Sequence, residues 1–196
     1  MASASAILQL ICPDRPGLVS ELSGWVAANG GDMEFVTVNP SLVLCPLMAP
    51  DFSTSLEAIK KLLEGSLPGI PSFGFSIVDV RDVADLHVRC LTAPNMAGER
   101  FISAGPFMWM GDVAAVLKEG LGTEARKVPT RRLPNFVLKL LSYFDPIVKQ
   151  VVGELDNVRD ASSQHAKDVL GWQTRDPKES ILDTARDMIR LGVVKV

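Results

Sequence analysis

Short apolar segments alternate with helical patterns along the chain, and this alternation limits the folds open to it. The apolar segment 6–12 precedes turn residues at 13–17, and apolar residues then recur at helical spacing over 18–26. A second apolar segment at 75–80 is likewise followed by a helical pattern. Because strands that alternate with helices form a sheet covered by helices, the sequence predicts an α/β fold.

The other elements follow from the same periodicities and from the glycine and proline positions. Further strands are predicted at 33–39, 100–104 and 125–128, and further helices at 55–63, 83–92, 110–119, 134–144, 145–152, 162–170 and 177–191. Extended loops are expected around Pro40, Pro46 and Pro50 and over 65–74. If the strand at 33–39 runs parallel to segment 6–12, residues 6–39 form a βαβ unit.

Three polar or glycine positions are expected to fix helix ends. Asp82 is expected to cap the helix at 83–92, because its side chain can accept from a free backbone N–H. Gly120 is expected to end the helix at 110–119, and Gly30 with its neighbours to end the helix that starts near Leu18.

Charge and composition argue against several classes of protein. The 20 basic and 23 acidic residues give a net charge of −3, which offers no general attraction for nucleic acid. No apolar run approaches the about 20 residues that span a bilayer. No basic residue precedes Arg15, so a secretory n-region is lacking and a cytoplasmic location is expected. Nucleic acid and membranes are therefore not expected as partners.

Metal binding is not expected either. The chain has three cysteines and two histidines but no Cys-x-x-Cys pair, so the cysteines are expected to be buried reduced thiols: Cys12, Cys45 and Cys90. Asp79, Asp82 and Asp85 lie close together in the sequence, but Asp82 is already assigned to a helix cap. We therefore predict no metal site.

The segment from Ile11 to Gly31, Ile-Cys-Pro-Asp-Arg-Pro-Gly-Leu-Val-Ser-Glu-Leu-Ser-Gly-Trp-Val-Ala-Ala-Asn-Gly-Gly, resembles the start of an ACT domain. It is most similar to the regulatory domain of formyltetrahydrofolate deformylase. The resemblance covers about residues 6–32 and implies an amino-acid-binding or dimer-forming loop at Asp14, Arg15 and Gly17. A purely structural βα unit is the alternative for this segment.

From about Glu34 onward, the chain resembles the C-terminal portion of an extended short-chain dehydrogenase/reductase of the dihydroflavonol-reductase-like, NAD-dependent epimerase/dehydratase group. The blocks that carry the resemblance are Val-Thr-Val-Asn-Pro-Ser-Leu-Val-Leu-Cys-Pro at 36–46, Phe-Ser-Ile-Val-Asp-Val-Arg-Asp-Val-Ala at 75–84, Gly-Glu-Arg-Phe-Ile at 98–102, and Asp-Ala-Ser-Ser with Leu-Gly-Trp at 160–172. Members of that family usually have glycine at the position of Cys45.

This second resemblance implies an oxidoreductase or epimerase with NAD or NADP as cofactor and a small molecule with a carbonyl or hydroxyl group as substrate. The residues that it places beside the nicotinamide are Asn39, Pro40, Ser41, Leu42 and Val43. A basic cluster can meet a substrate or cofactor phosphate in the family, and from it Arg131 is the substrate-binding candidate. A solvated basic face is the alternative for Arg126, Lys127, Arg131 and Arg132.

The motifs that carry the family's chemistry are lacking in this sequence. A Tyr-x-x-x-Lys pair passes a proton to or from the substrate oxygen, but the single tyrosine, Tyr143, is followed by Ile147 at the fourth position. Tyr143 is expected to be a packing residue. The nearest match to a glycine-rich phosphate turn, 120–125, follows a helix and not a strand. We therefore predict no catalytic residue and no independent turnover.

The two resemblances meet near residue 32 and predict two domains. Residues 1–32 form an ACT-like βα fragment, and 33–196 form an incomplete Rossmann-like parallel sheet with the substrate-side C-terminal lobe of an extended short-chain dehydrogenase. A sheet that lacks its early strands exposes an edge, so marginal stability, self-association or a partner that completes the sheet is expected. Three interpretations stay open: a reductase-derived chain without turnover, an amino-acid-binding module, and a structural fragment.

Overall fold

The computed structural model describes residues 18–29, 35–50, 53–143 and 152–195, in two compact units, 1–35 and 36–196. In the first unit the helix α1, Leu18–Ala28, confirms the helical pattern predicted there, and Asn29 Nδ2 donates to Trp25 O at its end. The predicted strand at 6–12, Gly30 and the start of the strand predicted at 33–39 lie outside the described residues.

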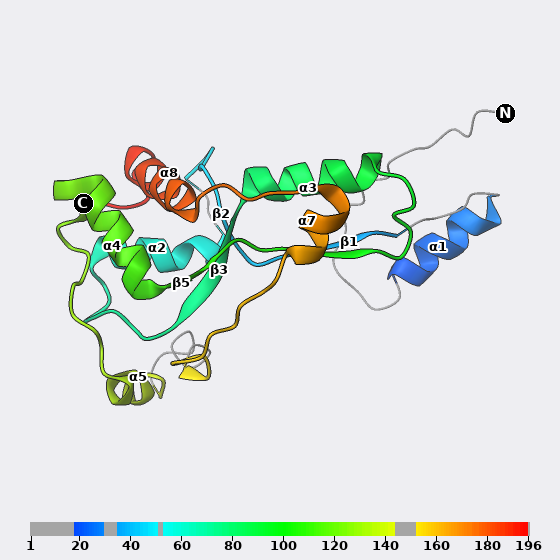
Figure 1. Cartoon of the computed structure of the whole chain (residues 1–196). Helices are drawn as coiled ribbons and strands as arrows, with labels where there is room; N and C mark the ends of the chain where they lie inside the picture. The colour runs from blue at the N-terminus through cyan, green and yellow to red at the C-terminus, as the bar shows by residue number, and fades with distance from the viewer. Residues whose placement is uncertain (1–17, 30–34, 51–52, 144–151, 196) are drawn as a thin grey trace. The chain divides into compact units, whose positions relative to one another are not determined.

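The second unit is built on two interrupted strands that run side by side (Figure 1). The strand β1, Thr37–Pro40, pairs in parallel with β4, Arg100–Ser103, and Val38 lies opposite Phe101. Just beyond Ser41 and Ser103 the two strands diverge. One continues as β2, Leu42–Leu44, and the other as β5, Phe107–Trp109.

A third strand lies between the diverging strands, and we call this arrangement the strand fork. This strand, β3, Gly74–Asp79, runs parallel to β2 on one side and antiparallel to β5 on the other. The Ile77 N–H donates to Pro106 O at 3.2 Å. A Cβ on Gly105 would lie only 2.0 Å from Ile77 O, so the fork requires glycine at this point.

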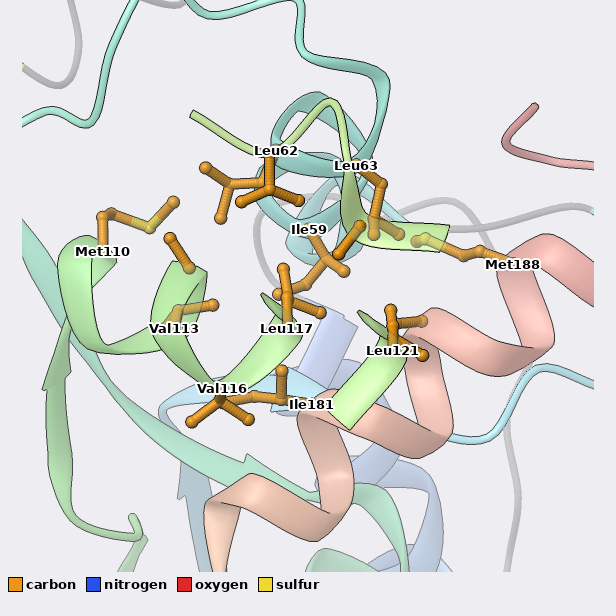
Figure 2. Packing of buried hydrophobic residues seen from close by; sticks show 14 of the residues in the cluster. Ile59, Leu62, Leu63, Met110, Val113, Val116, Leu117, Leu121, Ile181 and Met188 are labelled. Carbon is orange, nitrogen blue, oxygen red and sulfur yellow. The ribbon is translucent and has the colours of Figure 1, made fainter. Parts of the chain in front are cut away.

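Two hydrophobic cores flank this fork. The larger is formed with α2, Glu57–Glu64, which follows a 3₁₀ turn, and with α4, Met110–Leu121, and α8, Pro177–Arg190. Figure 2 shows its side chains converging from these three helices: Ile59, Leu62, Leu63, Met110, Val113, Val116, Leu117, Leu121, Ile181 and Met188. The apolar periodicities of the three helices thus enclose a common interior.

The smaller core lies against β1 and β4. It is covered by α3, Val80–Thr92, and α7, Gln164–Leu170. Its buried members are Val78, Leu86, Cys90, Met96, Phe101, Ala166 and Trp172. The short helix α5, Asn135–Leu141, lies within the predicted 134–144, whereas most of the helix predicted at 145–152 falls outside the described residues.

Most of the predicted elements of the second unit are confirmed, with ends shifted by a few residues. These are the helices predicted at 55–63, 83–92, 110–119, 162–170 and 177–191 and the strands predicted at 75–80 and 100–104. Pro177 occupies the first turn of α8, where its missing N–H costs nothing, and Asp176 accepts from the Lys178 N–H at 3.0 Å. Strong periodicity and clear end signals made these elements predictable.

Two predictions about strands and loops were wrong, and one strand was missed. The stretch with Pro40 and Pro46 contains the strand β2, because the prolines stand at its ends and leave 42–44 free to pair. The predicted strand at 125–128 is instead the end of a 3₁₀ turn, Gly122–Ala125, followed by a turn. The strand β5 was not predicted, because three residues are too few to show a period.

The predicted end of α4 at Gly120 was also wrong. The helix continues through Gly120 to Leu121 and ends at Gly122, which has a φ of 55°. A Cβ on Gly120 would lie 2.3 Å from Leu182 Cδ2, so this glycine allows α4 and α8 to approach closely. Its role is in helix packing and not in helix termination.

We expect Gly105→Ala to lower the free energy of unfolding by about 1–3 kcal/mol, because the new methyl group overlaps the Ile77 carbonyl. Gly111→Ala is the matched control, since its Cβ meets nothing within 4 Å and alanine favours the helix by up to about 1 kcal/mol. Urea unfolding of both variants measures the difference. Equal stability of the two variants would contradict the fork geometry.

Candidate functional site

A cavity of about 270 Å³ lies beside the strand fork. Its lining comes from the start of β2, the start of β3 and the segment before α7: Ser41, Leu42, Gly74, Phe75, Ser76, Glu154, Asn157, Arg159 and Ala161. The fork thus brings two of the predicted nicotinamide-side residues, Ser41 and Leu42, next to β3 and to a segment more than 80 residues further along the chain.

The other three predicted nicotinamide-side residues do not line this cavity. Asn39 Oδ1 accepts from Arg100 Nε at 2.9 Å across the two paired strands. Pro40 is exposed, and Val43 packs against the smaller core. The alternation of side chains along a strand explains part of this division, because neighbouring residues face opposite sides of the sheet.

Some polar groups around the cavity have hydrogen-bond partners, and one buried hydroxyl does not. The Ala161 N–H donates to Ser76 Oγ at 3.3 Å, and Arg159 Nε pairs with Glu154 at 2.7 Å near the surface. Ser41 Oγ is shielded from solvent and has no hydrogen-bond partner within the described part of the chain. A buried hydroxyl without a partner beside a cavity is a group that a bound amide or carbonyl can satisfy after a change of rotamer.

A second cavity, of about 410 Å³, lies beyond Ser72 and Asp156. Asp156, in a left-handed conformation with φ 60°, donates its N–H to Ser72 O at 2.7 Å and accepts from Ser72 Oγ at 2.6 Å. Ser72 and Asp156 line the larger cavity, and Gly74 and Asn157 line the smaller one. This pair of hydrogen bonds therefore holds the two loops together where the cavities approach each other.

The predicted substrate residue Arg131 lines neither cavity, but its neighbour Arg132 lines the larger one, together with Trp109. The Arg131 carbonyl accepts from the Ile70 N–H at 2.8 Å, which fixes this segment. All four members of the predicted basic cluster are exposed, and Lys127 Nζ donates to Lys195 O. Of the predicted basic cluster, Arg132 and not Arg131 therefore lines a cavity.

The carboxylate of Asp79 is a centre of hydrogen bonds. It is the actual cap of α3, because it accepts from the Arg81 N–H at 2.8 Å, so the cap predicted at Asp82 was wrong. Asp79 also accepts from the Arg81 side chain, from Ser180 Oγ at 2.6 Å and from Arg175. The part of the chain that the structure describes contains no group of three side chains that could hold a metal ion.

Asp82 and Asp85 have separate partners. Asp82 is buried, and its Oδ2 accepts from the Arg175 N–H at 2.9 Å, while its carbonyl accepts from Trp172 Nε1 at 2.9 Å. Asp85 pairs with Arg89 at 2.7 Å on the exposed side of α3. The sequence block at 79–85 therefore ties α3 to the segment around Trp172.

Burial raises the pKa of the Asp79 carboxyl, but hydrogen bonds from Arg81 and Ser180 outweigh burial and lower the pKa from 3.8 to about 2. Burial raises the pKa of the Cys45 and Cys90 thiols. Both thiols are free, Cys90 is buried and Cys45 is partly buried, so neither is an activated nucleophile. Cys12 lies outside the described residues.

Tyr143, His87 and the stretch 120–125 are the other features that could carry chemistry. Tyr143 is 84% exposed, so its expected packing role was wrong. His87 is exposed, and its Nδ1 lies 2.8 Å from Val83 O. The glycine-containing stretch 120–125 lies at the C-terminal end of α4, where carbonyls and not N–H groups are free. The stretch 120–125 therefore does not fit a pyrophosphate.

The fold is that of Rossmann-like reductases and epimerases. The yeast methylglyoxal/isovaleraldehyde reductase, solved with NADPH, has a TM-score of 0.64 and 23% identity and is matched over 89% of this chain and 48% of its own. A nucleoside-diphosphate-sugar epimerase from Pseudomonas aeruginosa has a TM-score of 0.64 and 18% identity, over 90% of this chain and 54% of its own. The predicted α/β class with an incomplete Rossmann-like parallel sheet is confirmed.

Curated relatives point to a narrower group. The chain is 30% identical to cinnamoyl-CoA reductase 1 and 36% identical to cinnamoyl-CoA reductase 2 of Arabidopsis thaliana, over 175 residues in each case. These matches cover 89% of this chain but only 45% and 47% of the relatives, so the chain spans less than half of their length. No family model matches the chain.

With the sequence blocks, these relatives confirm the resemblance to NAD(P)-dependent reductases and epimerases of the extended short-chain dehydrogenase/reductase family. They lend no support to the ACT-like interpretation, and its loop residues Asp14, Arg15 and Gly17 lie outside the described residues. Among the described helices, none has the length and apolar character needed to cross a membrane.

We expect Asp79→Asn to destabilise the protein by on the order of 3 kcal/mol at neutral pH, because it removes the buried charge that Arg81 and Arg175 share. Since the folded-state pKa lies below 3.8, the carboxylate's contribution is complete above about pH 4 and is lost as the pH falls towards 2. Denaturant unfolding as a function of pH measures both effects.

Asp85→Asn is the control for this prediction. Its ion pair with Arg89 lies on the surface, so the loss is expected to stay below about 1 kcal/mol. If the two variants have the same stability and the same dependence on acid, Asp79 is not the centre that its contacts indicate.

Proposed function

We propose that this chain forms the substrate-side part of a nicotinamide-dependent reductase for small carbonyl compounds. The observation that carries the proposal is the cavity at the strand fork, which brings Ser41 and Leu42 against Phe75 and Arg159. The similarity to cinnamoyl-CoA reductases over 89% of the chain supports it. The orphan hydroxyl of Ser41 supports a polar ligand atom at this wall.

The substrate is proposed to be small, because the cavity holds about 270 Å³ and Leu42 and Phe75 supply apolar surface. A substrate with an anionic extension can continue past Ser72 towards Arg132, which lines the larger cavity. The segment with Arg131 therefore remains our candidate for substrate binding, with the neighbouring guanidinium as the group that makes contact. A carbonyl is proposed as the reacting group, by analogy with the relatives.

Turnover by this chain alone is not proposed. Reduction of a carbonyl needs a proton donor beside the oxygen, and this sequence offers no Tyr-x-x-x-Lys pair. Reduction also needs a site that binds the cofactor's phosphates, and residues 120–125 do not provide one. The chain's own residues bind and orient one end of the reactants, whether the cofactor is NAD or NADP.

We expect nicotinamide mononucleotide to bind weakly at the fork and to shift the backbone NMR signals of Leu42, Phe75 and Ala161. Adenosine monophosphate is the matched control ligand and is expected to leave these signals unchanged, because the described stretch 120–125 does not fit its phosphate. Larger shifts with adenosine monophosphate, or shifts confined to 120–125, would contradict the proposal.

We expect no oxidation of NADPH above background when the purified chain is mixed with a panel of aliphatic and aromatic aldehydes. The reason is the missing proton donor and phosphate site. Loss of NADPH fluorescence with time measures the rate. A rate that scales with protein concentration would show that a proton donor exists in the chain.

We also propose that the chain associates with itself through an exposed sheet edge. Within the part of the chain that the structure describes, β1 pairs with β4 alone. Unpaired strand edges are templates for pairing with another chain.

A further inference from the structure

The segment from Asp156 to Ala161 runs along the smaller cavity and is held at both ends near the start of β3. At one end the Asp156 N–H donates to Ser72 O at 2.7 Å, and at the other end the Ala161 N–H donates to Ser76 Oγ at 3.3 Å. Arg159 lies between these two anchors and lines the cavity. The backbone therefore positions Arg159, and the segment does not depend on the Arg159 side chain.

The Arg159 side chain has a weakly held partner. Among the described residues that line this cavity, Arg159 is the one cation and Glu154 the one anion. Arg159 Nε lies 2.7 Å from Glu154 Oε2, and the two side chains are 76% and 35% exposed. Ion pairs at such exposure contribute little to stability, because water and salt compete for both charges. Another carboxylate can therefore replace Glu154 beside the guanidinium.

The rest of the lining offers two further kinds of contact to a ligand. Leu42 and Phe75 supply apolar surface, and the buried Ser41 Oγ has no hydrogen-bond partner within the described part of the chain. A hydroxyl donates to a carbonyl oxygen, and a guanidinium donates two parallel N–H groups to a carboxylate. A ligand that uses all three contacts has a carbonyl group, a short hydrocarbon part and a carboxylate.

We infer that the substrate of the proposed reductase is a small oxo acid, whose carboxylate takes the place of Glu154 beside Arg159. This inference rests on the proposed function and narrows its substrate from carbonyl compounds in general to those that carry a carboxylate. Arg159 then determines specificity, and Glu154 is an internal competitor that lowers the affinity for anions.

The exchange of carboxylates favours the acid over an uncharged carbonyl compound. An uncharged compound leaves the pair of Arg159 and Glu154 as it is and gains nothing from either charge. An oxo acid brings its own carboxylate, and its hydrocarbon part excludes water from the new pair, which strengthens the attraction. Glu154 then turns to solvent, where its charge is readily hydrated because the side chain is already partly exposed.

Binding of phenylglyoxylate, an oxo acid, and of its uncharged methyl ester tests this inference with the full chain. The backbone NMR signals of Leu42, Phe75 and Ala161 report occupation of the cavity. We expect the acid to bind about fivefold or more tightly than the ester, because only the acid pairs with the guanidinium. Added salt should weaken binding of the acid alone, since it screens a partly exposed charge pair.

Variants of the two charged residues separate their roles. Arg159→Gln should weaken binding of the acid about fivefold or more and leave the ester unchanged, because it removes the charge that pairs with the carboxylate. Glu154→Gln should tighten binding of the acid about twofold or more, because it removes the competitor. Arg126→Gln is the matched control, since it makes the same change in net charge on an exposed side chain that lines neither cavity.

The outcomes distinguish this inference from the proposed function. Equal binding of the acid and the ester, or equal weakening of the acid by Arg159→Gln and Arg126→Gln, overturns the inference even where nicotinamide mononucleotide still shifts the same signals. If phenylglyoxylate, its ester and nicotinamide mononucleotide all leave these signals unchanged, the proposed function falls with it. Unchanged signals from α4 and α8, which enclose the larger core, show in each variant that the fold is intact.

Discussion

The buried carboxylate of Asp79 is the interaction on which the rest of the second unit depends. It stands at the end of β3, caps α3 through the Arg81 N–H and receives Ser180 Oγ from α8. The larger core lies against α8 and the smaller core against α3, so this one side chain joins the two. Its charge is compensated by Arg81 and Arg175, which is why a fully buried carboxylate can remain ionised.

The strand fork depends on the position of β3, and the cavity depends on the fork. Because β3 separates β2 from β5, the start of β2 and the start of β3 line a common hollow. Gly105 allows β3 to lie between β2 and β5, since any side chain at position 105 would meet the Ile77 carbonyl. The conformation that creates the candidate site is therefore set by backbone contacts, and the side chains around it only decide what the site can hold.

Local sequence patterns predicted the helices and strands with clear periods, but they did not predict contacts between residues far apart in the chain. The helices α3 and α8 and the strand β3 have clear periods and were found. Asp79 caps α3 through the Arg81 N–H, and its other partners, Arg175 and Ser180, lie about 100 residues away, where no local pattern shows them. Ser41 and Leu42, which the family resemblance named, line the cavity, but Arg159 lies in an irregular segment that gave no sequence signal.

The two halves of the second unit differ in how far their described residues enclose a core. The three-stranded part has a core enclosed by α2, α4 and α8. Among the described residues the paired strands β1 and β4 have no further neighbouring strand, and α3 carries exposed apolar side chains. The predicted nicotinamide-side residues 39–43 run from one part into the other. The proposed site keeps its wall because the enclosed part holds it, and its affinity for a dinucleotide is expected to be limited because the described residues show no glycine-rich phosphate turn after a strand.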